Sequence, residues 1–352
     1  MLLLHFLACT SGTTPAPVPV PLHTGDTAVL PETGDPGPVD DGWAFEPVDG
    51  MVCGGGAPTG IGVNEGSDPT RLVVYLVGGG ACWDGVSCFV LEAAANLEVA
   101  WGEAHLEAEL GPVRASGLLD RDDTSSPLHT ASWAYVPYCT GDLHIGDAVR
   151  YHDVFNPARA THHVGNTNIT LVLERLHAEH PDVEELWLLG SSAGGYAAQL
   201  QAHRFAETWP NAQLRVFADG SPMIQPGEGR WGLWQSAWNA QLPPGCTGCS
   251  ASLPAVLAHQ AAALPNVPFA LDTYTEDLVI TLFLAQPLGG LAGPQAALIA
   301  DQYGSDQLSV FRVEGTDHTM LGNPTGVVGP GGVVLRDWVD DWVAGRPLTD
   351  VL

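Results

Sequence analysis

Short apolar runs recur along the chain and alternate with segments whose apolar residues follow helical spacing. Each run is rich in β-branched and aromatic residues and has the length of one strand, so each predicts a buried strand. The predicted strands are Leu72–Val77, Ser132–Tyr138, Glu185–Leu189, Gln213–Ala218, Pro268–Leu271 and Gln307–Val313. Near-continuous apolar strands that alternate with helices are typical of a parallel sheet covered on both faces.

Helical spacing is clearest in two segments. Apolar residues at i, i+3, i+4 and i+7 predict a helix between Asn166, a candidate N-cap, and His180. The same spacing predicts a helix over Leu335–Val343, and Gly345 behind it is a helix stop. With the strands, these helices indicate the α/β class, with a mostly parallel central sheet and helices on both faces.

The segment Arg230–Ser252 departs from this alternation and predicts a small insertion that contains two cysteines. Trp231, Trp234 and Trp238 recur in it at spacings of three and four residues. Such a row is either the core face of a lid or a platform for sugar or acyl groups, and the core interpretation is preferred.

The first 41 residues differ from the rest of the chain. Residues 1–9 hold a short apolar run followed by Cys9, which is typical of a signal segment whose cysteine is lipidated; a plain secretory signal is the alternative. Residues 10–41 are rich in Pro, Thr, Gly and Asp and predict a tether, and residues 42–352 predict one folded domain. No window holds 18 uninterrupted apolar residues, so a transmembrane helix is not predicted.

The charge balance narrows the function classes. The 352 residues include 40 acidic residues, twelve arginines and no lysine, for a formal charge of −28. Binding to phosphate backbones or anionic lipid head groups needs a basic surface that displaces their counterions. Nucleic-acid binding is therefore excluded.

Six cysteines remain beyond Cys9, an even number that suits an oxidising compartment. Short separations favour the pairs Cys82 with Cys88 and Cys246 with Cys249, which leaves Cys53 for Cys139; this is one of fifteen pairings. The Cys246 and Cys249 spacing also fits zinc or dithiol chemistry, but its flanks indicate a loop, so a structural disulfide is preferred.

The clearest chemical signal is Gly190-Ser191-Ser192-Ala193-Gly194, which follows a predicted strand and precedes an Ala-rich helical segment. A G-x-S-x-G sequence between a strand and a helix is the context of a nucleophile elbow, where a strained turn tolerates only small neighbours and exposes the serine hydroxyl. Ser192 is therefore the predicted nucleophile.

A serine hydroxyl needs a base to take its proton, and in hydrolases of this kind an acid and then a histidine follow the serine along the chain. His318 lies in a Gly-containing loop after the last predicted strand and is the predicted base. Asp272, directly behind the strand Pro268–Leu271, is the preferred acid. Further candidates are Asp277, Asp219, Glu276 and Asp317.

The oxyanion of an ester intermediate needs hydrogen-bond donors that are already in place. Gly78-Gly79-Gly80 follows the first predicted strand, and glycines let backbone N–H groups approach a substrate oxygen closely. We expect Gly79 or Gly80 to act together with the N–H of Ala193. A second run, Gly54–Gly56, follows no clear strand and stays unassigned.

These motifs resemble the pectin acetylesterase and Notum-like carboxylesterases of the α/β-hydrolase superfamily, in family order and over most of the chain beyond the tether. The matching stretches are Cys53-Gly54, Gly78–Asp84, Tyr138–Asp142, Gly190–Gly195 and Ala218–Ser221. The resemblance implies an α/β-hydrolase fold for residues 42–352, disulfide-bonded cysteines, and Ser192, Asp272 and His318 as the triad. It also implies that Asp219 is a post-strand residue outside the triad.

The chain departs from the family pattern at two places. Ala81 and Cys82 separate the glycines from Trp83, which often follows them directly in the family. Thr275 stands where the family usually has Gln three residues after the acid, which keeps Asp277 as an alternative to Asp272.

His162 and His163, with Asp142, His144 and Asp147, raise the alternative of a metal site. Adjacent residues seldom point at one ion, and a triad enzyme needs no metal, so hydrogen bonding at the start of the following helix is preferred. We expect no cofactor and no metal.

Taken together, the sequence predicts an exported serine esterase, a monomer attached to a membrane through a lipidated Cys9 or else secreted. It is expected to hydrolyse acyl esters, with acetyl as the expected group, of a small hydroxylated molecule or a polysaccharide. The charge of −28 argues against polyanionic pectin as the substrate. The alternatives are a lipid or long-acyl esterase and a catalytically silent carbohydrate-binding surface lipoprotein.

Overall fold

The computed structural model describes residues 42–110, 118, 121, 123–152, 159–227, 229–303 and 307–352. Residues 40–352 form one compact unit. The predicted signal segment 1–9, Cys9 and the tether 10–41 lie outside the described residues. Among the described helices, none combines the length and the apolar character needed to cross a bilayer.

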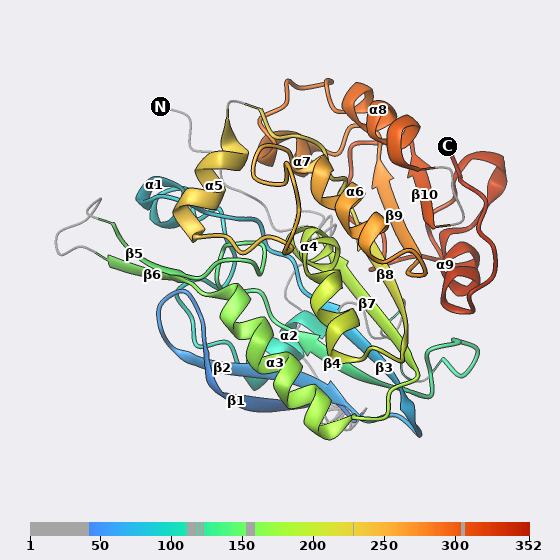
Figure 1. Ribbon diagram of the computed structural model, residues 1–352, viewed down its shortest axis with the longest axis horizontal. Helices are drawn as coiled ribbons and strands as arrows, with labels where there is room; N and C mark the ends of the chain where they lie inside the picture. The colour runs from blue at the N-terminus through green and yellow to red at the C-terminus, as the bar shows by residue number, and fades with distance from the viewer. Residues whose placement is uncertain are drawn as a thin grey trace, which may run out of the picture. The chain divides into compact units, whose positions relative to one another are not determined.

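An eight-stranded sheet is the centre of the described fold (Figure 1). Its spatial order is β1-β2-β4-β3-β7-β8-β9-β10. Strand β2 pairs antiparallel with both β1 and β4, and the strands in the order β4-β3-β7-β8-β9-β10 are parallel to one another. A separate antiparallel hairpin joins β5 and β6. The strands are β1 Ala44–Val52, β2 Pro58–Asn64, β3 Asp68–Leu76, β4 Ala131–Val136, β5 Ala148–His152, β6 Arg159–His163, β7 Glu185–Ser191, β8 Gln213–Asp219, β9 Phe269–Tyr274 and β10 Leu308–Val313.

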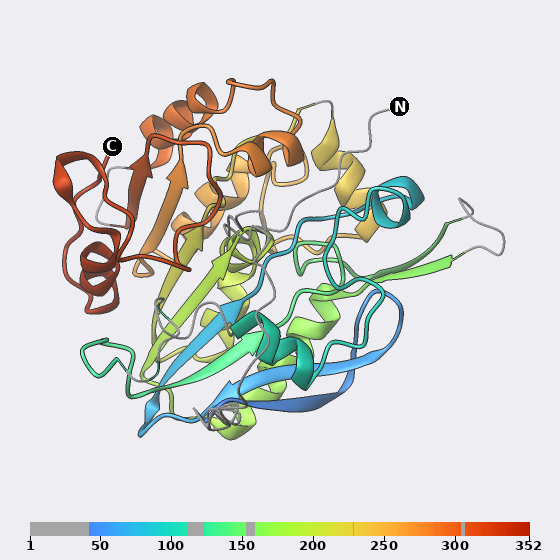
Figure 2. The same cartoon turned by 180° about the vertical axis from the view of Figure 1, so that it is seen from behind.

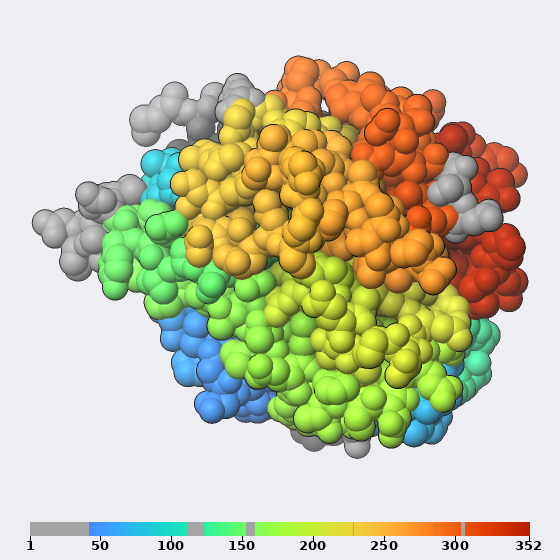
Figure 3. Space-filling view, in the orientation of Figure 1, coloured from blue at the N-terminus to red at the C-terminus, as the bar shows by residue number. Residues whose placement is uncertain are grey.

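Helices cover both faces of the sheet, as the sequence predicts. Figure 1 shows α3, α4 and α6 in front of the strands, and Figure 2, seen from the other side, shows α2 and α9 on the opposite face of the sheet. Figure 3 shows the packed surface that α3, α4 and α6 form on the front face. The helices are α1 Gly85–Phe89, α2 Glu103–Leu110, α3 Gly165–Glu179, α4 Ala193–Thr208, α5 Arg230–Trp238, α6 Pro254–Ala263, α7 Leu278–Phe283, α8 Ala292–Gln302 and α9 Leu335–Val343.

The central strands are apolar along most of their length because each of their faces meets a core. In β7, Leu186 and Leu188 join the core under α3 and α4, whereas Trp187 and Leu189 join the core under α2 and α9. Successive side chains of a strand point to opposite faces, so a strand between two helix layers carries no polar alternation. Burial of one such leucine stabilises the fold by about 1.5–3 kcal/mol.

The predicted helix ends are partly correct. Helix α9 spans Leu335–Val343 as predicted, and Gly345 behind it adopts φ +66°. Helix α3 begins at Gly165, with Val164 as its N-cap, so the prediction of Asn166 as the cap is wrong. The Asn166 side chain and carbonyl accept hydrogen bonds from Arg204 of α4 instead.

Three disulfides join the cysteines as the short separations suggested: Cys53 with Cys139, Cys82 with Cys88, and Cys246 with Cys249. The last one closes the insertion that begins with α5. The three tryptophans of α5 are at most 2% exposed, which confirms their assignment to the core.

Strand β10 lies at one edge of the sheet, and the segment around Val351 covers it. Arg312 donates its backbone N–H to the carbonyl of Val351, and Val351 donates its own N–H to the carbonyl of Val310. These two hydrogen bonds form a short parallel bridge alongside the strand.

Candidate active site

Ser192 lies in the sharp turn between β7 and α4, with φ 55° and ψ −123°. The turn needs glycine on both sides for steric reasons. A Cβ at Gly190 would collide with the carbonyl of Gly194, and a Cβ at Gly194 would collide with the carbonyl of Leu76. A side chain at Gly195 would meet the Ser221 hydroxyl. The glycines of the motif therefore allow the strained serine backbone that a nucleophile elbow requires.

His318 follows β10 and is oriented by a carboxylate. Its Nδ1 lies 2.6 Å from Oδ2 of Asp277, and the Asp277 side chain is fully buried. The other carboxylate oxygen, Oδ1, caps α7 by accepting the N–H of Ile280 at 3.0 Å. Because a carboxylate accepts hydrogen bonds, the proton is assigned to Nδ1, which leaves a lone pair on Nε2. Among the described residues, this buried Nε2 has no hydrogen-bond partner.

The turn Asp219–Ser221 lies between the elbow and the His318 loop. The carbonyl of Asp219 accepts the N–H of Ser192 at 2.8 Å, and a Cβ at Gly220 would lie 3.4 Å from Cε1 of His318. Within the described contacts, no direct hydrogen bond joins His318 to Ser192. Such bonds are often long in free hydrolases and shorten when substrate binds.

Asp272, the acid preferred from the sequence, does not orient His318. The structure pairs His318 with Asp277 instead. The predicted strand ended at Leu271, but β9 runs on to Tyr274, which keeps Asp272 inside the sheet. Its neighbour there is Asp219 of β8, and its Oδ1 accepts the N–H of Gly220 at 3.1 Å. The alternative, Asp277, lies beyond the true strand end and reaches the histidine.

The remaining acid candidates also have other roles. Glu276 accepts the N–H groups of Leu291 and Ala292, and Asp317 is exposed. Burial and the adjacent Asp219 carboxylate raise the pKa of Asp272 well above its usual range. A raised pKa disfavours the charged form of Asp272, which does not suit an acid whose charge must stabilise an imidazolium.

The glycine run after β3 lies against the nucleophile. A Cβ at Gly78 would stand 2.7 Å from Cβ of Ser192 and 3.2 Å from the nitrogen of Ala193. Gly80 pairs with Ala94 in a bridge whose hydrogen bonds run through the neighbours of Gly80. Among the described residues, the N–H groups of Gly80 and Ala193 therefore have no acceptor. A Cβ at Gly79 would meet the side chains of Ala95 and Tyr138.

A small cavity of about 20 Å³ opens beside these groups. Gly80, Ser192 and Ala193 line it together with apolar side chains: Ala81, Leu143, Tyr196, Trp234, Ile280, Phe283 and Leu284. The cavity holds about one water-sized group. It therefore brings Ser192, the backbone of Gly80 and Ala193, and an apolar wall together in one place.

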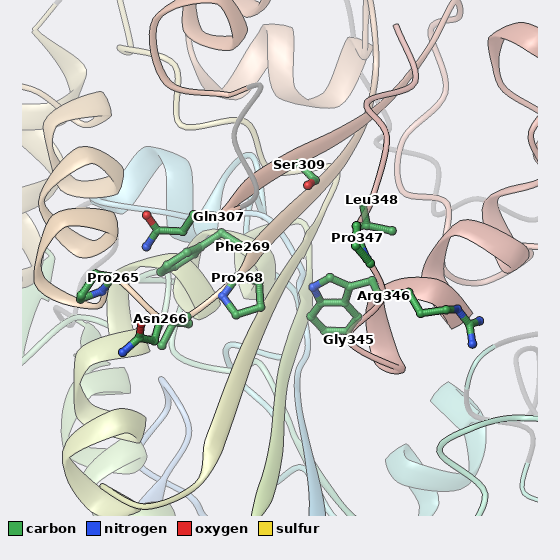
Figure 4. Close-up of a pocket in the computed structure, with 12 residues that line it drawn as sticks. Pro265, Asn266, Pro268, Phe269, Gln307, Ser309, Gly345, Arg346, Pro347 and Leu348 are labelled. Atoms are coloured by element: carbon green, nitrogen blue, oxygen red, sulfur yellow. The ribbon is translucent and has the colours of Figure 1, made fainter.

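A larger cavity of about 380 Å³ lies elsewhere (Figure 4). Pro268 and Gln307, in its wall, precede β9 and β10 and so mark the amino ends of these strands. Ser192 lies at the carboxyl end of the parallel strand β7, which is the opposite end of the sheet. None of the sequence-predicted catalytic residues lines this larger cavity.

The segment Tyr138–Asp147 contacts the residue that precedes the glycine run, a role that the sequence did not reveal. Nε2 of His144 lies 3.1 Å from the carbonyl of Val77, which directly precedes the glycine run. The buried carboxyl group of Asp142 accepts hydrogen bonds from Thr140, His144 and Gly165. Burial raises the pKa of Asp142 and lowers that of His144.

His162 and His163 lie in β6, where each places Nδ1 against a backbone carbonyl, that of Gly54 at 3.0 Å and that of Thr140 at 2.8 Å. Among the described residues, one group has ligand atoms close enough for a metal ion, His163 with Cys82 and Cys88. These two cysteines are bonded to each other. Hydrogen bonding thus accounts for both histidines, in a strand rather than at a helix start.

Comparison with known proteins adds to this geometry. The solved structure of the Wnt deacylase Notum from Drosophila superposes with a TM-score of 0.68 at 16% sequence identity, covering 88% of this chain and 96% of that one. At this identity the likeness establishes the shared fold. A search of curated protein sequences gives no match.

A family model gives the more specific result. The model described as pectinacetylesterase matches residues 45–225, about half of the chain. The matched range includes the glycine run after β3, the segment Tyr138–Asp147 and the elbow with Ser192. The chain therefore belongs to the pectinacetylesterase family and is a carboxylic ester hydrolase.

Proposed function

We propose that the protein is an exported serine esterase that removes acetyl groups from an uncharged hydroxylated substrate such as a polysaccharide. The observation that carries this proposal is the hydrogen bond from His318 to the buried Asp277, beside the elbow with Ser192 and the small cavity.

The proposed reaction has two halves. The Ser192 hydroxyl attacks the ester carbonyl carbon while Nε2 of His318 takes its proton, and Asp277 stabilises the resulting imidazolium. The oxyanion accepts hydrogen bonds from the N–H groups of Gly80 and Ala193. Collapse of the intermediate expels the substrate hydroxyl, which receives the proton from His318. Water then attacks the acyl-enzyme by the same route and releases the carboxylic acid and the free serine.

Cavity size supports an acetyl group over a long chain. A cavity of about 20 Å³ accommodates one methyl-sized group next to the reacting carbon. Phe283, Leu284 and Trp234 are among the side chains that line it, so an acyl tail of many carbons requires a larger space than the cavity provides. This favours a deacetylase over the lipid or long-acyl esterase.

The arginines support an uncharged substrate. Among the described residues, six arginines pair with carboxylates: Arg71, Arg159, Arg175, Arg215, Arg336 and Arg346. The other five donate to neutral oxygens: Arg121, Arg150, Arg204, Arg230 and Arg312. Arg230, next to the cavity wall, is held by the carbonyls of Leu282 and Phe283. With a net charge of −28, such a surface repels a polyanion such as pectin.

Three disulfides support export, because such bonds persist in oxidising compartments. Lipidation of Cys9 is the proposed means of attachment. Mass spectrometry of the mature protein tests it, since a lipidated Cys9 adds acyl mass to the first residue and a plain secretory signal does not.

The first test is hydrolysis of p-nitrophenyl esters from acetate to palmitate by the full chain and by Ser192→Ala. We expect a maximum at acetate and no activity of the variant. A maximum at long chains would replace the acetyl proposal by the long-acyl alternative. Equal inactivity of both proteins on every ester would favour the silent binding protein.

The second test compares acetate release from acetylated xylan, which is neutral, and from acetylated pectin, which is polyanionic. We expect faster release from xylan at low salt and a smaller difference at high salt, because salt screens the repulsion. Faster release from pectin at low salt would refute the proposed preference for uncharged substrates.

A further inference from the structure

Asp219 stands out among the buried charged groups because the proposed triad does not use it. It ends β8 and its side chain is fully buried. The Nδ1 of His318, which a triad acid must reach, is already bonded to Asp277. Asp219 therefore has some other role at the centre of the site.

One set of its contacts reaches the loop that carries the base. Oδ1 of Asp219 accepts the N–H of Met320 at 2.6 Å, and Oδ2 lies 3.4 Å from the nitrogen of Leu321. These two residues follow His318 by two and three positions, and Thr319, between His318 and Met320, adopts φ +59°. A backbone turn in this sparsely populated region persists only where its surroundings hold it, as the carboxylate does here.

A second set of contacts reaches the nucleophile. The Ser191 hydroxyl donates to Oδ2 of Asp219 at 2.5 Å and lies 2.7 Å from the Tyr75 hydroxyl. The backbone carbonyl of Asp219 accepts the N–H of Ser192 at 2.8 Å. The Ser221 hydroxyl bonds to the carbonyls of both Ser192 and Asp219. One residue thus contacts the serine turn and the histidine loop at once.

Both carboxyl oxygens of Asp219 take part in these contacts. Its carboxylate accepts three donors: the Ser191 hydroxyl and the N–H groups of Met320 and Leu321. Burial, followed by the adjacent Asp219, raises the pKa of the strand neighbour Asp272.

We propose that Asp219 is a positioning residue, which sets the distance between Ser192 and His318 by binding the histidine loop and the serine strand with one carboxylate. This inference rests on the proposed function, since it assigns a role within the same reaction. A displacement of about 1 Å between catalytic groups costs about 100-fold in rate. Neither catalytic side chain needs to be altered for the loss to appear.

The test is the variant Asp219→Asn, assayed with p-nitrophenyl acetate as the full chain. We expect kcat to fall about 100-fold with KM within about twofold, because the acyl cavity itself is intact. The matched control is Asp317→Asn, which removes a carboxylate next to His318 without removing any of these hydrogen bonds. We expect the control to retain kcat within about threefold.

A second variant, Ser191→Ala, breaks only the serine side of the link and serves if Asp219→Asn fails to fold. We expect roughly a tenfold loss of kcat in Ser191→Ala. The double variant should lose no more than Asp219→Asn alone, since both changes break one connection.

A loss of kcat in the double variant equal to the product of the two single losses would overturn the proposal. So would an Asp219→Asn enzyme as active as Asp317→Asn, or a loss that matches its unfolded fraction in a thermal melt. A wild-type protein without esterase activity would instead refute the proposed function.

Discussion

The variant Asp277→Asn separates the two carboxylates that the sequence left as rivals. In the wild type, Asp277 accepts from Nδ1 of His318 through Oδ2 and from the N–H of Ile280 through Oδ1. Asparagine has one acceptor oxygen. If this oxygen keeps the cap of α7, its NH₂ group faces Nδ1 and donates to it. The proton of the imidazole then moves to Nε2, and a protonated Nε2 cannot accept the serine proton.

The size of the effect follows from this change of tautomer. A triad aspartate replaced by asparagine lowers the rate about 10⁴-fold, which equals about 5.4 kcal/mol of transition-state stabilisation. The fold should change little, because asparagine caps a helix about as well as aspartate. The assay is kcat/KM for p-nitrophenyl acetate, together with a thermal melt.

The matched comparison is Asp272→Asn. Because Asp272 contacts Gly220 rather than His318, we expect the kcat/KM of Asp272→Asn to stay within about threefold of the wild type. A larger loss in Asp272→Asn than in Asp277→Asn would refute the pairing and return the acid to Asp272.

Three further outcomes are expected. Phe283→Ala enlarges the acyl cavity, so the ratio of hexanoate to acetate hydrolysis should rise at least about tenfold; an unchanged ratio would mean that the tail lies elsewhere. Burial lowers the pKa of His163 to about 4 from 6.5, so the unfolded chain binds the proton first and stability falls by up to about 3 kcal/mol as the pH drops through this window; melts of His163→Gln should show a weaker pH dependence. Loss of the Cys53–Cys139 disulfide, which spans 86 residues, should cost about 2–5 kcal/mol in urea unfolding, and an unchanged midpoint would contradict this.

The parts of the site that the sequence predicts are those whose pattern lies within a few consecutive residues. The elbow is one uninterrupted strand, turn and helix, and the steric need for Gly190 and Gly194 is visible within a few residues. The six predicted strands all occur in the sheet, because burial on both faces makes most of their residues apolar.

The choice between Asp272 and Asp277 could not be made from nearby residues in the sequence, because it depends on where strand β9 ends. Strand β9 continues past Leu271 because Arg312 and Val313 of β10 pair with Thr273 and Tyr274. That register depends on another strand, so the polar residues Asp272 and Thr273 look like a loop in the sequence. An error of three residues in one strand end changed which carboxylate was preferred.

Long-range contacts account for the rest. Strands β1 and β2 contain Pro47, Gly50, Gly60 and Gly62, which weaken every local strand signal, and a Cβ at Gly60 would collide with the carbonyl of Glu46 across the pair. Asp219 similarly acts through Met320, 101 residues away. Neither feature leaves a pattern within a short window of sequence.

The covered edge of β10 has a consequence for solubility. An open edge strand presents a row of unsatisfied N–H and C=O groups to which a second molecule can add its own strand. The backbone of Val351 occupies part of that row by bonding to Val310 and Arg312. The segment around Val351 thus blocks intermolecular β-pairing along this part of the edge. Deletion of residues 348–352 should make the purified enzyme aggregate without changing the structure around Ser192.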